Sequence, residues 1–226
     1  MRNLDPDLHK GEELRDTHRE KVARNEVRVD RSWSRPCRAY NLQIELDPGT
    51  RSALGKTQEC LLLAEPNLLV CPKETLHVSV AWLLAVRASY PVPKDVLWER
   101  HGDEWMAELN RIVAQRENFR IVYEDVIATD SAVIALARPA GPVNRIREMI
   151  RERLHLPSET LNEADLVHTT LFRYRGPLSA PANFLAVLED TSAQAATEVH
   201  ELVVSKELVY PSLEAEVLAR LPLASH

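Results

Sequence analysis

Two short motifs in the sequence combine an imidazole with a hydroxyl group at the same spacing. His77 is followed two residues later by Ser79, and His168 is followed in the same way by Thr170. Apolar residues flank both pairs, as in a β-strand, where side chains i and i+2 project from one face about 7 Å apart. An imidazole exchanges protons near neutral pH, and a hydroxyl donates hydrogen bonds to phosphate oxygens. Two such pairs facing each other predict acid–base chemistry at a phosphate group.

The strands that carry these pairs occupy corresponding places along the chain. We predict strands over residues 76–84 and 165–174. Each follows a predicted helix, over residues 50–64 and 142–154 respectively, and the second helix has apolar residues along one face. The repeated order of elements indicates an α+β protein with two halves of similar content. The boundary between the halves is expected near residues 139–141.

Further elements complete this α+β pattern. Residues 40–46 alternate between apolar and polar types, the period of a half-buried strand. The other predicted elements are helices over 103–115 and 181–189, a strand pair over 119–129 and 132–137, and closing strands over 199–206 and 214–221.

Residues 1–36 differ from the rest because they are rich in charges of both signs and poor in apolar residues. Residues 11–29 could form a solvated helix with paired charges or a partly ordered arm. Such a segment buries too little apolar surface to fold alone. We therefore interpret residues 1–36 as a charged N-terminal extension that packs on the body, residues 37–226, or on a partner.

Composition and charge exclude several classes of protein. The net charge of −6 argues against binding long nucleic acid by phosphate neutralisation, although a few arginines suffice for one phosphate. No apolar run approaches the roughly 20 residues of a membrane span, and the first residues do not resemble a secretory signal. We expect reduced thiols in a cytoplasmic protein, since three cysteines show no CxxC spacing: Cys37, Cys60 and Cys71.

Motifs for other chemistries are missing from the sequence. There is neither a glycine-rich phosphate loop nor a GxSxG nucleophile elbow. We expect no metal and no cofactor, because the remaining histidines lack the clustered spacing of metal ligands: His9, His18, His101, His155, His200 and His226.

The paired motifs resemble the 2H phosphoesterases, a superfamily that includes bacterial RNA 2′-5′ ligase-like proteins and cyclic nucleotide phosphodiesterases. Residues 168–173, His-Thr-Thr-Leu-Phe-Arg, are similar to the His-x-Thr-Leu-x-Arg pattern of that family. The first motif departs from it, with Ser79 where threonine is commoner. The resemblance covers about residues 38–222. It implies two pseudo-symmetric lobes, each an antiparallel sheet with flanking helices, around a central cleft that one motif strand from each lobe faces.

The resemblance also implies an activity. His77 and His168 would be the general acid and the general base of a metal-independent phosphodiesterase, with His77 favoured as the acid. Ser79 and Thr170 would bind the phosphate oxygens. The substrate would be a cyclic phosphodiester or a 2′-5′ linkage in a nucleotide or a short RNA end. Two alternatives remain: a non-catalytic nucleotide-binding module on the same fold, and an RNA-end processing or ligase-like factor.

Other residues are weaker candidates for substrate binding. Arg173 lies five positions after His168 and would face away from it on a regular strand. It reaches the phosphate only through a bulge or a strand end; otherwise it forms a structural ion pair. Tyr40 and Tyr174 could stack on a base. Trp82 could wall the cleft, although core packing is the favoured interpretation. Four arginines are interpreted as the solvated face of their helix: Arg145, Arg147, Arg151 and Arg153.

Overall fold

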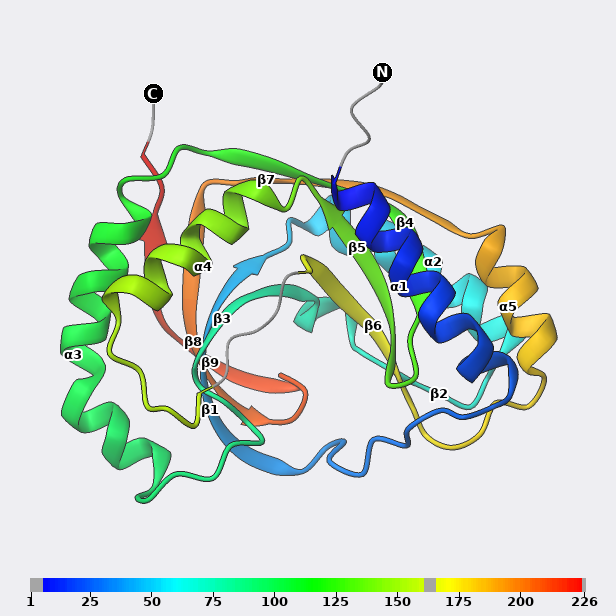
Figure 1. Ribbon diagram of the computed structural model, residues 1–226, viewed down its shortest axis with the longest axis horizontal. Coiled ribbons are helices and arrows are strands. Elements are labelled where there is room, and N and C mark those ends of the chain that lie inside the picture. The colour runs from blue at the N-terminus through cyan, green and yellow to red at the C-terminus, as the bar shows by residue number, and fades with distance from the viewer. Residues whose placement is uncertain (1–5, 161–165, 225–226) are drawn as a thin grey trace.

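The computed structural model describes residues 6–160 and 166–224, which form helices and two antiparallel sheets (Figure 1). The helices are α1 (Pro6–Ala23), α2 (Pro48–Ala64), the short 3-10 helix η1 (Lys73–Thr75), α3 (Lys94–Val113), α4 (Gly141–Arg153) and α5 (Pro181–Glu189). The strands are β1 (Pro36–Glu45), β2 (Leu68–Val70), β3 (His77–Leu84), β4 (Phe119–Ala128), β5 (Ala132–Arg138), β6 (His168–Tyr174), β7 (Ser192–Val199), β8 (Glu201–Val209) and β9 (Glu214–Pro222).

Local signals explain most of these boundaries. The Asp47 side chain accepts hydrogen bonds from the backbone N–H groups of Gly49 and Thr50, and so caps the N-terminus of α2. Prolines stand in the first turns of α2, α4 and α5, where their missing N–H group is not needed. The predicted helix over 181–189 is confirmed at both ends.

Several elements differ from the prediction. Helix α3 begins at Lys94 rather than 103, because its first turns pack Leu97 and Trp98 against the core. Strand β7 was not predicted, since its many alanines give little hydrophobic alternation, and it forms by pairing with β4. Strand β2 has only three residues and depends on β6. The start of the strand predicted over 165–174 lies partly outside the described residues, and β6 begins at His168.

The two sheets do not divide the chain into an N-terminal and a C-terminal half. One sheet has the order β3-β1-β8-β9 and the other the order β2-β6-β5-β4-β7. The first combines early strands with the last two, and the second combines β2 with the middle of the chain. The α+β class with two antiparallel sheets is confirmed, but a single lobe boundary near 139–141 is wrong. Sheet membership follows backbone pairing between distant segments, which the order of elements along the chain does not reveal.

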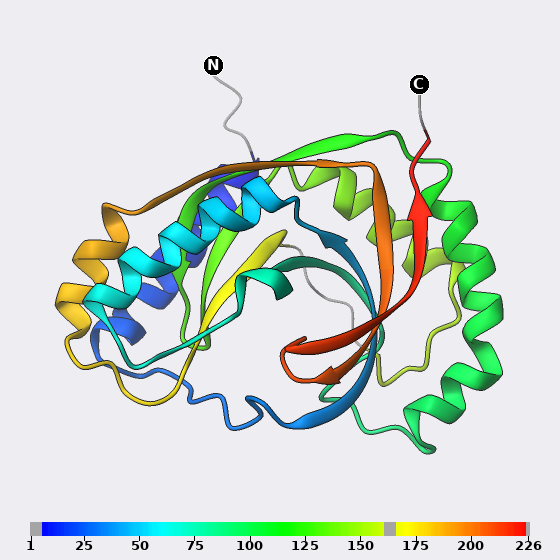
Figure 2. The same cartoon turned by 180° about the vertical axis from the view of Figure 1, so that it is seen from behind.

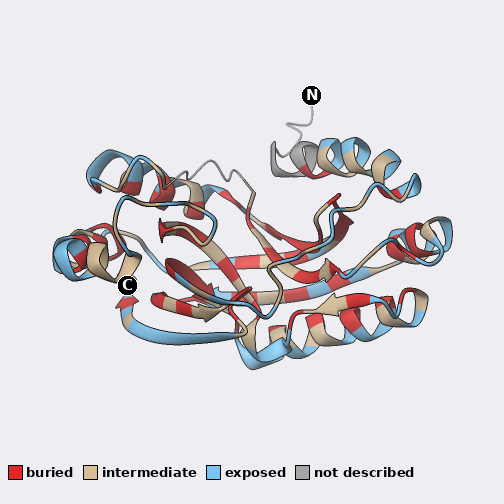
Figure 3. Cartoon of the chain, turned by 90° about the horizontal axis from the view of Figure 1, so that it is seen from below, coloured by how far each residue is buried: buried red, intermediate tan, exposed pale blue. Residues whose placement is uncertain are grey.

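Helices cover both sheets. Helices α3 and α4 pack on the four-stranded sheet, and α2 and α5 pack on the five-stranded one (Figures 1 and 2). Helix α1 packs on the opposite face of the five-stranded sheet. This follows from the alternation along β5, whose residues 133, 135 and 137 belong to the main core while residues 132, 134 and 136 belong to a second cluster under Leu14 of α1. Buried residues therefore line the strands and the inner sides of the helices (Figure 3).

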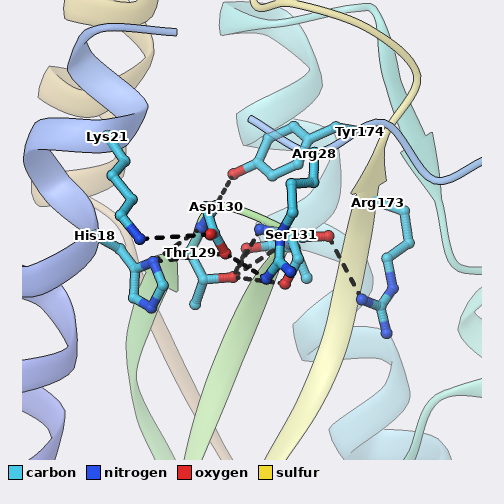
Figure 4. Close-up of polar contacts among 9 residues, drawn as sticks. His18, Lys21, Arg28, Thr129, Asp130, Ser131, Arg173 and Tyr174 are labelled. Atoms are coloured by element: carbon cyan, nitrogen blue, oxygen red, sulfur yellow. Dashed lines mark hydrogen bonds and ion pairs between the residues drawn. The ribbon is translucent and has the colours of Figure 1, made fainter. Parts of the chain in front are cut away.

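The N-terminal extension is packed on the body of the protein. Helix α1 ends at Ala23, and the chain then runs on to β1. At the turn between β4 and β5, Asp130 faces three cationic or titratable side chains of the extension (Figure 4). They are His18, Lys21 and Arg28, and the Arg28 contact is a hydrogen bond of 2.8 Å. No helix in the described part of the chain is long and apolar enough to cross a membrane.

Candidate active site

The structure brings the two His-x-Ser/Thr motifs to one cavity. Strand β3 of the four-stranded sheet and strand β6 of the five-stranded sheet lie side by side. The cavity has a volume of about 330 Å³, and His77, Ser79, His168 and Thr170 all contribute to its lining. Residues separated by 91 positions in the sequence thus share one concave surface, an arrangement that the family resemblance implied.

Both motif strands contain a β-bulge at the same distance from their histidine. In the pairing of β1 with β3, the register skips Val80, and in the pairing of β5 with β6 it skips Leu171. Each skipped residue lies three positions after the histidine. An extra residue in one strand reverses the alternation beyond it. Side chains five positions after each histidine therefore turn back to the histidine's own face.

These side chains are Trp82 on β3 and Arg173 on β6, and both line the cavity. The interpretation of Trp82 as core packing is therefore wrong. For Arg173, the structure contains the bulge that the sequence argument required for it to reach the cavity. Its Nη1 donates a long hydrogen bond of 3.4 Å to the Ser131 carbonyl (Figure 4). The cavity is thus walled by an aromatic ring from one lobe and a guanidinium from the other.

His77 is held in one orientation and one tautomer. Its Nδ1–H donates to the Thr75 carbonyl at 2.8 Å, which leaves Nε2 3.3 Å from the Ser79 hydroxyl. Burial lowers the pKa of His77, whereas the Thr75 hydrogen bond and the negative charge of Glu207 act in the opposite direction. Glu207 is itself buried and lines the same cavity. His77 is thus neutral in the free protein, in surroundings that include groups able to stabilise its cation.

His168 has a less favourable environment for a positive charge. Burial is the largest cause that lowers its pKa to about 4, and the positive charges of Arg173, Arg147 and His77 add to the effect. A hydrogen bond with the Leu166 backbone acts in the opposite direction but is the smallest of these causes. His168 is therefore neutral over the physiological range of pH.

Known structures share this arrangement of elements. Neither the search of family models nor the search of curated proteins found a match. Among solved structures, TT0787 of Thermus thermophilus superposes with a TM-score of 0.60 at 15% identity, over 83% of this chain and 99% of its own. A protein described as a phosphoesterase gives 0.58 at 14% identity, with the same coverage. E. coli LigT in its apo form gives 0.51 at 13% identity, over 84% of this chain and 99% of its own.

The chain has the fold of E. coli LigT and of the protein described as a phosphoesterase. LigT has also been solved with ATP, with 3′-AMP and with NADP+. The matched proteins are covered almost completely while this chain is not, so part of this chain has no counterpart in them.

Thr169 connects the two motif strands, a role that the sequence did not suggest. Its hydroxyl donates to the backbone carbonyl of His77 at 3.0 Å. Since that bond uses its only proton, the Tyr123 hydroxyl must donate to Thr169 across their 2.8 Å contact. Both side chains are fully buried. Thr169 lies between His168 and Thr170, and its hydrogen bond fixes the position of one motif strand relative to the other along the strand direction.

Arg147 makes a second connection between the motif strands. Its Nε donates to the Val80 carbonyl at 2.9 Å, and its Nη2 donates to the carbonyls of Ser79 and Leu166 at 3.0 and 3.1 Å. The side chain is buried, so its assignment to the solvated face of the helix is wrong, although Arg145, Arg151 and Arg153 are exposed. Position 147 lies one turn after the buried Val143, and this was the signal available in the sequence.

The two candidate tyrosines lie outside the cavity lining. Tyr40 points toward α3, where its ring stacks on Trp98 at 4.4 Å and its hydroxyl donates to Asp95 at 2.6 Å. Tyr174 alternates with Arg173 and so faces away from the cavity; its buried hydroxyl donates to the Thr129 carbonyl (Figure 4). Neither ring is placed to stack on a base in this cavity, which corrects the sequence-based expectation.

One cysteine reaches the site. Cys71 lines the cavity, but burial raises the pKa of its thiol to about 12, so that the thiol stays protonated and is a poor nucleophile. In the described ranges no three His, Cys, Asp or Glu side chains are grouped in a way that could hold a metal ion.

Proposed function

We propose that this protein hydrolyses a cyclic phosphodiester or a 2′-5′ phosphodiester, in a nucleotide or a short RNA end, without a metal ion. One observation carries the proposal: both imidazoles and both motif hydroxyls line the same cavity, on strands from different sheets. A phosphate bound between them would have an acid–base group and a hydrogen-bond donor on either side. The 2H phosphoesterase fold is consistent with this reaction class.

The acid and base roles follow from the two environments. His168, whose pKa is the more clearly depressed, is neutral and would take a proton from the attacking water. His77, stabilised as a cation by the Thr75 carbonyl and Glu207, would give a proton to the leaving ribose oxygen. A bound phosphate adds negative charge between the rings and raises both pKa values, which favours loading the acid. Water oxygen then bonds to phosphorus, and the bond from phosphorus to the leaving oxygen breaks.

The charge on the non-bridging phosphate oxygens needs donors in the transition state. Ser79 and Thr170 would donate their hydroxyl protons there, and Arg173 would supply positive charge. Once His77 is protonated, its Nε2 no longer accepts from Ser79, so the Ser79 hydroxyl becomes free to point toward the phosphate.

The cavity supports a small nucleotide as substrate. Its volume of about 330 Å³ lies at the lower end of the usual range for small-molecule sites. Trp82 offers a ring against which a base could stack. LigT, which shares the fold, has been solved with several nucleotides. The net charge of −6 disfavours long nucleic acid as a partner.

The decisive experiment measures hydrolysis of 2′,3′-cyclic nucleotides and 2′-5′ dinucleotides in excess EDTA. His77→Ala and His168→Ala should each lower turnover by roughly 10² to 10⁴, the usual contribution of general acid–base catalysis. His155→Ala is the matched control, because His155 is exposed and outside the cavity lining. Its turnover should stay within about twofold of the wild type.

Each outcome separates the proposal from its alternatives. Turnover that survives EDTA and is lost only in the cavity variants supports the two-histidine hydrolase. Nucleotide binding without turnover, weakened by the same two variants, would instead indicate a nucleotide-binding module. Joining of RNA ends in place of hydrolysis would indicate a ligase-like factor. Unchanged turnover in both histidine variants would overturn the catalytic assignment.

A further inference from the structure

The N-terminal extension places a buried carboxylate behind the cavity arginine. Asp30 follows α1, and its side chain is only 3% exposed. Its Oδ1 accepts a hydrogen bond from the Ser32 backbone N–H at 3.0 Å. Its Oδ2 lies 3.8 Å from Nε of Arg173 and 3.7 Å from Nη2 of Arg87. Both arginines line the cavity.

This carboxylate stands at the junction of the two lobes. Arg173 comes from β6 of the five-stranded sheet, whereas Arg87 follows β3 of the four-stranded sheet. The backbone N–H of Asp30 donates to the Tyr174 carbonyl at 2.9 Å, and the N–H of Ser34 donates to the Tyr210 carbonyl at 2.9 Å. The extension is therefore bonded to both lobes: Asp30 is itself the anchor to β6, and Ser34 is the anchor to Tyr210, which follows β8.

Asp30 and Arg173 form an ion pair that is too long to be a hydrogen bond. Neither Oδ2 of Asp30 nor Nε of Arg173 meets hydrogen-bond geometry with a described residue, and both atoms are buried; the Tyr210 hydroxyl is the other polar group that interacts with the Asp30 carboxylate. The remaining bond of the Arg173 guanidinium, to the Ser131 carbonyl, is long at 3.4 Å. A buried carboxylate destabilises the fold unless it faces positive charge, so the Asp30 carboxylate favours a position of the Arg173 guanidinium close to it. This contact does not use all the N–H donors of the guanidinium. The other N–H groups stay available for a ligand.

We propose that Asp30 of the extension is a positioning residue for the active site, whose carboxylate holds the Arg173 guanidinium toward the phosphate of the substrate. This inference rests on the proposed phosphodiester hydrolysis and adds to it that Asp30 of the N-terminal extension is part of the working site. The matched structures are covered almost completely by this chain, which keeps a further stretch that they lack.

The test uses the full-length protein and a double-mutant cycle between Asp30→Asn and Arg173→Gln. Asp30→Asn should lower kcat/KM by about tenfold, mainly through kcat, as for other groups that orient a functional side chain. In the Arg173→Gln background the same change should cost less than about twofold, because no guanidinium remains to be positioned.

A matched control separates positioning from docking of the extension. Arg28 lies two residues before Asp30 and anchors the same segment to Asp130, with its side chain 70% exposed. Arg28→Gln should keep kcat/KM within about twofold of the wild type. Asp30→Glu retains the charge but displaces it by one methylene. It should give a smaller loss than Asp30→Asn, again only when Arg173 is present, and it serves if Asp30→Asn fails to fold.

The outcomes distinguish this inference from the proposed function. If Asp30→Asn adds its full effect to Arg173→Gln, or if Arg28→Gln is equally damaging, the positioning role is overturned while hydrolysis by the histidine pair stands. If the wild type hydrolyses none of the substrates, the same cycle is run on the affinity for inorganic phosphate. A loss of affinity that disappears in the Arg173→Gln background then supports the positioning of Arg173, and its absence refutes it.

Discussion

Replacing Thr169 by valine tests how the two motif strands are held together. The change keeps the shape of the side chain and removes one hydroxyl. That hydroxyl donates to the His77 carbonyl at 3.0 Å and accepts from Tyr123 at 2.8 Å. Both side chains are fully buried, so no water can replace the lost partner. We expect Thr169→Val to destabilise the fold and to loosen the register of the histidine strands.

The magnitude follows from the two bonds. Losing the donation to the His77 carbonyl costs about 1 kcal/mol of net hydrogen-bond energy, and leaving the Tyr123 hydroxyl buried without a partner costs about 2 kcal/mol. Thr169→Val should therefore lower the free energy of unfolding by about 3 kcal/mol. Tyr123→Phe alone should cost about 1 kcal/mol, because Thr169 still donates to His77. The double variant should lose only about 2 kcal/mol, since no hydroxyl is left unpaired.

Equilibrium unfolding in urea, followed by circular dichroism, measures all three values. Thr57→Val is the matched control: Thr57 is also buried, but its hydroxyl makes a single long bond of 3.4 Å to the Ala53 carbonyl within α2. Its cost should stay below about 1 kcal/mol. A Thr169→Val cost as small as that of the control, or strict additivity with Tyr123→Phe, would refute the inferred network.

Three further predictions concern the cavity and its surroundings. The pKa of His168 is depressed to about 4 in the folded protein. Between pH 6.5 and 4 the unfolded chain therefore binds a proton at His168 that the folded protein does not bind. The free energy of unfolding should fall between pH 6.5 and 4, and His168→Gln should reduce that slope in urea titrations at several pH values. Trp82→Ala should raise KM roughly 5- to 100-fold if a base stacks on the ring, while Trp82→Phe keeps most of the affinity; equal KM values for all three proteins would count against stacking. Tyr40→Phe removes the hydrogen bond to Asp95 and should lower the free energy of unfolding, measured in a urea titration, by about 1 kcal/mol without changing KM. A raised KM would instead indicate that Tyr40 contacts the substrate.

The sequence alone identified the candidate reactive residues and the local geometry around them. The spacing of His77 with Ser79 and of His168 with Thr170 places each pair on one face of its strand, because strand alternation is a local property. The same reasoning predicted the helices that begin near Pro142 and Pro181, because a proline in the first turn is a local signal, whereas the helix that begins at Pro48 was predicted to begin at residue 50. The α+β class followed from the order of these elements.

Only the tertiary structure decided which strands share a sheet and which side chains reach the cavity. Sheet pairing joins segments far apart in the chain, so β8 lies beside β1 and a boundary near 139–141 has no structural meaning. The two bulges, visible only against a partner strand, turn Trp82 and Arg173 into the cavity. The linking roles of Arg147 and Thr169 likewise depend on carbonyl groups brought close by folding. Local pattern therefore identifies the reactive groups, while long-range backbone pairing decides what surrounds them.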